Sequence, residues 1–303
     1  MYTLTTAHLA QLCALNEFPV DSEGLIFFGL RGCLPLHPFD QAFRAEHALT
    51  AAEVDHLHPR CTLIQWLPGE GTFAVYPGST VPHRVYIEKA RARGGRGANE
   101  LLTGYFADYR KGIHRASTPR RHEAFLQTSV RPFWRTTDDL DYGLEDPVDI
   151  DLPGDNLHAA WCAGVEAERF ASAGCQVVVG FPQCPARGDQ PGTGPWKAFH
   201  AAAYACSQNT FGYVLINGAD ARRLAVAGQE GMERVRFGSW GTRAQRVQEA
   251  LRQKGFYEGQ VDGDFGARSL RALLEFQTHA FGPHADDGVC GPQTAEALGI
   301  AWP

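Results

Sequence analysis

Apolar residues between positions 24 and 218 gather in short runs that Gly, Pro or Asp interrupt. β-Branched and aromatic residues dominate these runs, as is typical of strands. The runs occupy 24–33, 62–68, 72–78, 124–130, 175–180 and 211–218. Only Gly-Glu-Gly separates 62–68 from 72–78, and this spacing predicts a hairpin. Helical spacing is clearest at 5–15 and 195–207. The pattern predicts a mostly β domain with a few helices over residues 1–222.

The C-terminal part of the chain contains an internal repeat. VDGDFGARSLRAL at 261–273 aligns with DDGVCGPQTAEAL at 286–298, and each copy has Asp-Gly-x-x-Gly before a short amphipathic segment. Asp-Gly favours a tight turn, and each following segment offers one apolar face to a shared core. Upstream, Val247 and Leu251 have helical spacing. We therefore predict a small all-α domain of three helices over residues 241–303.

This unit resembles the type 1 family of peptidoglycan-binding domains. The resemblance rests on the helix around Gln248, DGDFG at 262–266, EFQ at 275–277 and DGVCGPQT at 287–294. It implies that the domain binds cell-wall glycopeptide, so peptidoglycan stem peptides and glycan are the expected partners. A helical tail without a ligand is the alternative. Residues 219–241 contain GQEG and GSWG, and 223–240 are interpreted as a linker.

Composition and charge exclude several classes of function. A net charge of −6 over 303 residues gives no general attraction to nucleic acid, so none is expected as a partner. No apolar run approaches the roughly 20 residues that span a bilayer, so no membrane span is predicted. The first residues lack a basic segment followed by a compact apolar one, so no secretory signal is predicted.

One cysteine is a candidate nucleophile. The eight cysteines are scattered without a CxxC pair, which argues against a zinc ribbon. Cys175 lies in SAGCQVVVG, 17 residues after His158 in GDNLHAAW. A thiol becomes a good nucleophile when a neighbouring imidazole takes its proton. Ala173 and Gly174 allow a sharp turn whose N–H groups can face a developing oxyanion.

The pattern His-x16-Cys with Ser-x-Gly-Cys resembles the YkuD-type catalytic domain of L,D-transpeptidases. The resemblance implies a β-rich sandwich or barrel, a Cys175 nucleophile that is acylated by a stem peptide, and His158 as its base. It further implies that the backbone carbonyl of Ala159 orients the imidazole and that the N–H groups of Gly174 and Cys175 bind the oxyanion. Ser172 would shape the turn. No cofactor is implied, and carbapenems are expected covalent inhibitors.

The chain departs from the family pattern at two positions. Ala173 replaces a second histidine, and Val177 stands where an arginine commonly holds the substrate. A changed substrate clamp is compatible with a branch of the family that forms 1,3 rather than 3,3 cross-links. In RPFWRTTDDLDYG, Arg135 is the candidate to replace the missing arginine, with Arg131 and Tyr142 as further substrate-binding candidates. A surface strand with solvated charges is the alternative.

The sequence leaves the fate of the acyl-enzyme open. An amine from a neighbouring stem would make the protein a cross-linking transpeptidase, a cysteine acyltransferase. Water would make it an L,D-carboxypeptidase or endopeptidase. In a third alternative the protein binds peptidoglycan without catalysis, and Cys175 is structural. The expected substrate places the protein in the periplasm or cell wall.

Other histidines suggest different chemistry. His114 and His122 invite a metal hypothesis, yet no HExxH motif is present and no metal site is predicted. His200 follows Cys175 by 25 residues, an order found in other cysteine peptidases of the cell wall. It lies inside a predicted helix, where a histidine more often packs or faces solvent.

Overall fold

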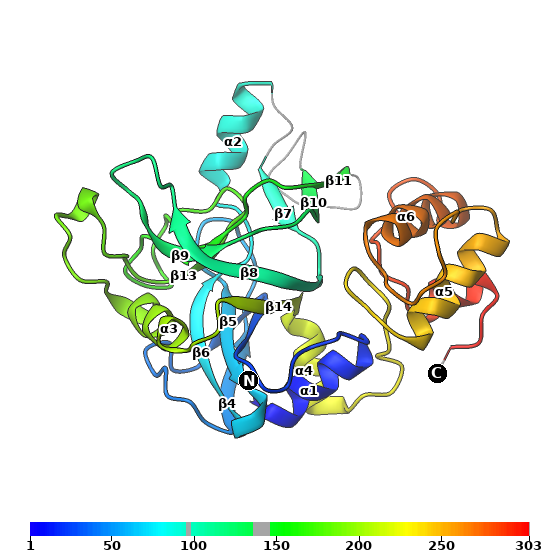
Figure 1. Cartoon of the computed structure of the whole chain (residues 1–303), viewed down its shortest axis with the longest axis horizontal. Coiled ribbons are helices and arrows are strands. Elements are labelled where there is room, and N and C mark those ends of the chain that lie inside the picture. Colours follow the sequence, from blue (N-terminus) through cyan, green and yellow to red (C-terminus); the bar gives the residue numbers. More distant parts are fainter. Residues whose placement is uncertain (95–97, 136–145, 303) are drawn as a thin grey trace.

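A computed structural model of the chain describes residues 1–94, 98–135 and 146–302. Its centre is a closed barrel of eight strands in the order β12-β13-β6-β5-β2-β14-β8-β9 (Figure 1). The barrel strands are β2 (Ile26–Arg31), β5 (Cys61–Leu67), β6 (Thr72–Ser79), β8 (Gly104–His114), β9 (His122–Leu126), β12 (Leu157–Ala159), β13 (Gln176–Val178) and β14 (Thr210–Asn217). Neighbouring pairs are antiparallel except β12 with β13 and β14 with β2.

The side chains of a barrel strand alternate between two apolar cores, one inside the barrel and one outside it. In β14, Phe211, Tyr213 and Leu215 pack inside the barrel, where aromatic rings fill the interior. Val214 and Ile216 belong instead to a second core outside it. Because successive side chains of a strand point to opposite faces, a strand that is covered on both sides reads as an unbroken apolar run.

The outer core lies under two helices and a small sheet. Helices α1 (Thr6–Leu15) and α4 (Gly218–Ala227) contact each other at one end of the barrel. The sheet contains β1 (Tyr2–Thr5), β4 (Glu46–Ala51) and β3 (Cys33–Pro35). Helix α3 (Gly194–Ala205) packs its buried face, which includes Trp196 and Phe199, against the barrel core.

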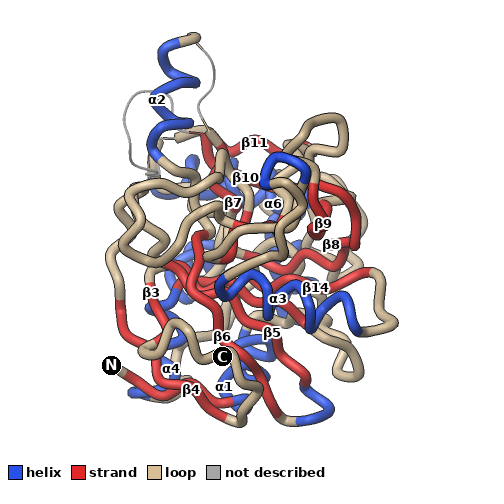
Figure 2. The backbone as a smooth tube through the Cα atoms, turned by 90° about the vertical axis from the view of Figure 1, so that its left-hand side faces the viewer, coloured by secondary structure: helices blue, strands red, loops and turns tan. Residues whose placement is uncertain are grey.

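The opposite end of the barrel carries a third sheet and a projecting helix. The strands are β7 (Asn99–Leu101), β10 (Arg131–Arg135) and β11 (Val148–Asp151), with β10 in the middle. Helix α2 (Arg84–Ala92) extends away from the barrel beside this sheet (Figure 2).

The C-terminal unit contains α5 (Thr242–Gln253), α6 (Ala267–Phe281) and α7 (Pro292–Leu298). A buried glutamine organises each copy of the repeat. Gln248 Oε1 accepts from the N–H of Gly263 at 2.8 Å, and Gln277 Oε1 accepts from the N–H of Gly288 at 2.9 Å. Each glutamine thus satisfies the backbone of one Asp-Gly turn.

A glutamate from the first domain caps a helix of the second. The Glu17 carboxylate accepts from the backbone N–H groups of Arg243 at 3.0 Å and Ala244 at 2.9 Å, at the start of α5. Arg243 donates to the carbonyls of Leu15 and Ala14 at the end of α1. The helix end that Gly241 leaves without a side-chain cap is therefore completed by the other domain.

Replacing Glu17 with alanine should lower the free energy of unfolding by about 1–2 kcal/mol, the usual effect of losing an N-terminal cap. The same change should loosen the docking of the helical domain, because both N–H groups lose their acceptor. Denaturation followed by circular dichroism and limited proteolysis near residue 241 measure the two effects. Glu23→Ala, at an exposed position, is the matched control and should be silent. Equal behaviour of the two variants would contradict the capping role.

The β-rich domain and the small helical domain are both as predicted from sequence. The predicted hairpin is confirmed, since β5 pairs with β6 up to Leu67 and Thr72. Helix α4 is not among the predicted helices, and it ends at Ala227, inside the segment interpreted as a linker.

Candidate active site

Two neighbouring parallel strands bring the predicted nucleophile and base together. β12 and β13 pair with Leu157 opposite Gln176 and His158 opposite Val177. The N–H of Gln176 donates to the carbonyl of Asn156 at 2.9 Å, so the pairing begins just after Cys175. Since side chains alternate along a strand, Cys175 and His158 lie on the same outer face of the barrel, and both line one pocket.

The thiol of Cys175 is held in its protonated form. Its Sγ donates to the carbonyl of Gly154 at 3.8 Å. Burial and the neighbouring Asp155 raise the pKa of the Cys175 thiol to about 12, against a smaller opposing effect of the backbone N–H groups of Asn156 and Cys175. Among the described residues no hydrogen bond joins the thiol to His158. Sγ must therefore turn towards the ring before reaction, as is common in the absence of substrate.

Ser172 fixes the turn before the nucleophile. Its Oγ donates to the carbonyl of Cys175 at 2.7 Å and accepts from the N–H of Gly174 at 3.2 Å. The shaping contact expected of Ser172 is therefore present. The same bond corrects the expectation for Gly174, because its N–H is engaged by Ser172 and does not face the pocket. The N–H of Cys175, which faces its own sulfur, is the oxyanion donor that this turn offers.

Gly174 is required by the shape of this turn. Its φ of +143° lies where only glycine is unstrained, and a Cβ there would meet Asp155 Oδ1 at 2.5 Å and the Asn99 Cβ at 2.7 Å. Gly174→Ala should cost about 1–3 kcal/mol of stability and displace Cys175, so thiol reactivity should fall as well. Gly164→Ala is the matched control, since nothing lies within 4 Å of its Cβ position. Thermal unfolding and the rate of thiol alkylation measure both effects, and an unaffected Gly174→Ala protein would contradict this account.

The His158 ring has a defined tautomer. Its Nδ1 lies 2.8 Å from the carbonyl oxygen of Ala159. Because a carbonyl only accepts, the neutral ring carries its proton on Nδ1, and Nε2 keeps a lone pair that can take a proton. Burial and the neighbouring His114 and His122 lower the pKa of His158 well below its usual range. At neutral pH the resting pair is thiol and imidazole rather than an ion pair.

Two further histidines surround His158. The His114 ring stacks on it with centroids 4.2 Å apart, and the His122 ring meets it edge-on at 5.6 Å. Asn156 Nδ2 lies 2.9 Å from His114 Nδ1. This contact holds the His114 ring against the segment that carries His158. His122 Nδ1 lies 2.8 Å from the carbonyl of Arg120, while its buried Nε2 has no partner among the described residues. Sequence reasoning considered both rings only as metal ligands.

The pocket has a volume of about 480 Å³ and a cationic rim. Lys89 from α2, Arg115 and Arg120 from the turn between β8 and β9, and Arg169 from the loop before the nucleophile line it. All four side chains are exposed, and within the described ranges none has an acidic partner in ion-pair distance. The arrangement suits a ligand that carries carboxylates. Lys89 begins the basic segment KARARGGRGANE at 89–100, but no local pattern links the four residues, because they lie far apart in the chain.

The structure does not bring the predicted arginines to the pocket. Arg131 is fully buried, pairs with Asp108 at 2.9 Å and lies over the Tyr109 ring at 3.9 Å, so it is a core residue rather than part of a substrate fork. Arg135 pairs with Asp149 at 2.7 Å and donates to Asn99 at 2.8 Å. Tyr142 lies outside the described residues.

Arg135 instead contributes to a network behind the nucleophile. Asn99 Nδ2 donates to the Asp155 carboxylate at 3.2 Å, and the Asn99 N–H donates to the carbonyl of Ala173 at 3.0 Å. Burial raises the pKa of Asp155 to about 7, against the lowering effect of Asn99 and of the two arginines. β7 therefore anchors the turn that carries Cys175.

The residues considered from the sequence for a metal site and for a second cysteine–histidine pair lie in the described part of the chain. No group of three or more His, Cys, Asp and Glu side chains there could hold a metal ion. His200 bonds to Glu123 at 2.8 Å and lines a separate pocket from Cys175. All eight cysteines are free thiols, and only Cys175 and Cys206 are partly exposed. Within the described residues, no helix is both long and apolar enough to cross a bilayer.

Comparison with known proteins identifies the C-terminal unit. Residues 241–298 match a family described as "Putative peptidoglycan binding domain". Over 52 residues the chain is 44% identical to the N-acetylmuramoyl-L-alanine amidase CwlM of Mycobacterium tuberculosis, a match that covers 17% of this chain and 12% of that protein. The chain thus spans about an eighth of the length of this relative. No solved structure matches the chain.

Proposed function

We propose that the barrel domain is an L,D-transpeptidase that cross-links stem peptides through an acyl-enzyme on Cys175. The C-terminal unit matches a peptidoglycan-binding domain, which supports a function related to peptidoglycan. The observation that supports this proposal is the pocket itself, in which a thiol and an imidazole whose Nε2 keeps its lone pair lie under a rim of four cations without an acidic partner among the described residues. Stem peptides are rich in carboxylates, so they fit this rim.

The proposed chemistry has two half-reactions. His158 Nε2 takes the thiol proton as Sγ attacks the donor carbonyl, and the Cys175 N–H stabilises the oxyanion. The C–N bond then breaks, and the proton passes from His158 to the leaving amine. In the second half an acceptor amine attacks the thioester and gives its proton to His158. The C–S bond breaks, and His158 returns the proton to the released Cys175 sulfur. The Ala159 carbonyl keeps the ring oriented throughout.

The site explains why the thiol stays protonated until substrate arrives. A substrate that covers the pocket brings a carbonyl beside Sγ and excludes water, which strengthens the attraction between the nascent thiolate and imidazolium. The cationic rim further favours the thiolate. We favour a 1,3 cross-link. Val177, which replaces the arginine that commonly holds the substrate, is buried, and the cations that can hold the substrate lie on the rim of the pocket instead.

Incubation of purified muropeptides with the full chain tests the proposal by mass spectrometry. Cross-linked dimers that depend on Cys175 and His158 are expected, and fragmentation locates the bond. Shortened stems instead of dimers would replace the transpeptidase by a cysteine carboxypeptidase or endopeptidase. Unchanged muropeptides with intact wall binding would leave a binding protein in which Cys175 is structural. Carbapenem acylation of Cys175 is the expected inhibition.

A further inference from the structure

A second pocket lies where the two domains meet, apart from Cys175. Its volume is about 270 Å³. Asn217 and Asp220 come from the end of β14 and from α4, Trp134 from β10, Arg234 and Arg236 from the segment before α5, and Asp287 from the second Asp-Gly turn. Both domains are therefore needed to form it. The apolar face of Trp134 also packs against the core of the helical domain.

Arg236 in this pocket is only partly paired. Its side chain is 5% exposed, Nη1 donates to Thr103 Oγ1 at 2.8 Å, and Nη2 lies 3.9 Å from Asp220. Nε is buried, and among the described residues it has no hydrogen-bond partner. Burying such a donor without an acceptor costs about 1–3 kcal/mol, and more for a charged group. Nη2, whose printed partner among the described residues is Asp220 at 3.9 Å, is the nitrogen at which a ligand acceptor can offset part of that cost.

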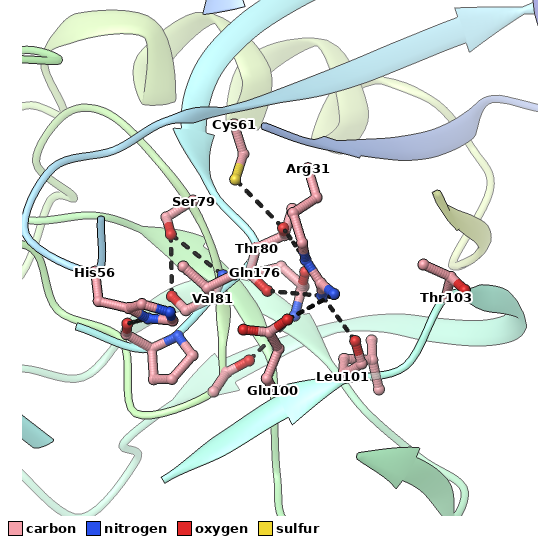
Figure 3. A network of polar contacts seen from close by, with 12 residues as sticks. Arg31, His56, Cys61, Ser79, Thr80, Val81, Glu100, Leu101, Thr103 and Gln176 are labelled. Carbon is pink, nitrogen blue, oxygen red and sulfur yellow. Dashed lines mark hydrogen bonds and ion pairs between the residues drawn. The ribbon is translucent and has the colours of Figure 1, made fainter. Parts of the chain in front are cut away.

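Arg31 on the same wall shows what a satisfied arginine looks like here. It pairs with Glu100 at 2.7 Å, donates to the carbonyl of Leu101 at 2.7 Å, and lies 3.3 Å from Thr80 Oγ1 (Figure 3). Figure 3 shows these groups converging on the Arg31 guanidinium, with Thr103 nearby. Arg31 is therefore a fixed part of the wall, whereas the Arg236 guanidinium has only Thr103 and the more distant Asp220 as partners among the described residues.

The lining combines the groups that hold a sugar ring. An indole offers an apolar face to ring C–H groups, carboxylates accept from hydroxyls, and amide and guanidinium groups donate to hydroxyl or acetamide oxygens. Trp134, the two aspartates, Asn217 and Arg236 supply each of these. Charge alone does not select an anion, because Arg234 and Arg236 face Asp220 and Asp287. The pocket therefore fits a polar, uncharged ring.

From this arrangement we infer that the pocket between the domains binds one N-acetylhexosamine ring of a glycan, with Arg236 bonded to a ring or acetamide oxygen. The inference is independent of catalysis. Strand β7 joins the two sites, since Asn99 holds the Cys175 turn while the carbonyl of Leu101 bonds Arg31. From Asn99 to Thr103 the chain covers at most about 13 Å, so a peptide attached to the bound sugar lies within reach of Cys175.

Calorimetric titration of the full chain with chitotriose and with N-acetylmuramic acid tests the inference. We expect binding of at least one ligand, and a loss of about tenfold or more in Asp220→Ala and in Arg236→Gln. Asp220 is half exposed, so its variant should remain folded, as circular dichroism can check. Asp21→Ala, an exposed position outside the pocket, is the matched control. Cys175→Ala should bind normally, which separates this result from a failure of catalysis.

Binding of both sugars places the acetamide in the pocket, whereas binding of N-acetylmuramic acid alone adds its carboxylate to the recognised groups. Either outcome supports the inference if Asp220→Ala weakens it. Absence of binding to both sugars would overturn it. Binding that is unchanged in Asp220→Ala would also overturn it, because the sugar would then occupy another surface.

Discussion

Cys175→Ala is expected to lower the rate of cross-link formation by at least about 10³-fold, because no other group in the pocket can form the acyl-enzyme. His158→Gln should have an effect of similar size, since the amide cannot take the thiol proton. Both variants should keep their fold and their binding to peptidoglycan sacculi. Product formation over time, measured by liquid chromatography, gives the rates.

Cys206→Ala is the matched control for the thiol. Cys206 is the other partly exposed cysteine, and its Sγ is bonded to the carbonyls of Ala202 and Ala203 in α3, away from the pocket. Its replacement should leave the rate unchanged. A Cys175→Ala protein that still forms cross-links would remove the thiol from the mechanism.

The free energy of unfolding is expected to fall in acid because of the histidine cluster, His114, His122 and His158. Burial lowers the pKa of His114 to about 4, that of His158 well below its usual range, and that of His122 as well. Each ring is neutral in the folded protein but protonates near 6.5 when unfolded. A lowered folded pKa contributes stability that is present above pH 6.5 and is lost as the pH falls towards 4.

Asp155 acts in the opposite direction. Its folded pKa of about 7 lies above the usual 3.8, so it stabilises the fold at low pH and loses that contribution as the pH rises. Burial raises the pKa of Asp108, but Ser129, Arg131 and Thr128 lower it overall. Asp108 therefore adds to the loss of stability in acid that the histidines cause. The three histidines and Asp108 lose stability as the pH falls, whereas Asp155 alone gains it. We therefore expect the folded protein to be destabilised in acid.

His114→Gln isolates one ring of the cluster. Between pH 7.5 and 4.5 the variant should lose about 2–3 kcal/mol less stability than the parent, from the shift of His114 alone. Chemical denaturation at the two pH values measures the difference. His37→Gln, at an exposed position, serves as control. If His114→Gln and the parent lose equal stability, the buried neutral cluster is not the cause.

The barrel strands could be predicted because both their faces are buried. β5, β6 and β14 read as apolar runs between Gly and Pro, and the period of the pattern is not needed to find them. β8 was missed, although it is the longest barrel strand, because GYFADYRKGIH alternates polar residues with aromatic ones along a half-exposed surface. Its strand character comes from pairing with β14 and β9 rather than from its own composition.

Only those residues of the site that lie close together in the sequence could be predicted from it. His158 lies on β12, Cys175 directly precedes the parallel neighbour β13, and Ser172 lies in the turn before it, so their spacing in the sequence carried the information. The cationic rim collects residues from α2, from the turn after β8 and from the loop before Cys175, which no local pattern links. Arg131 was assigned to the substrate because its buried partners, Asp108 and Tyr109, cannot be identified without the fold.

Mass spectrometry of the intact protein after brief incubation with a donor stem peptide, or with a carbapenem, tests whether Cys175 is the nucleophile. We expect one adduct per chain, located by peptide mapping on Cys175, absent from Cys175→Ala and present in Cys206→Ala. A protein that stays unmodified while it still binds peptidoglycan, or an adduct on another cysteine, would contradict it.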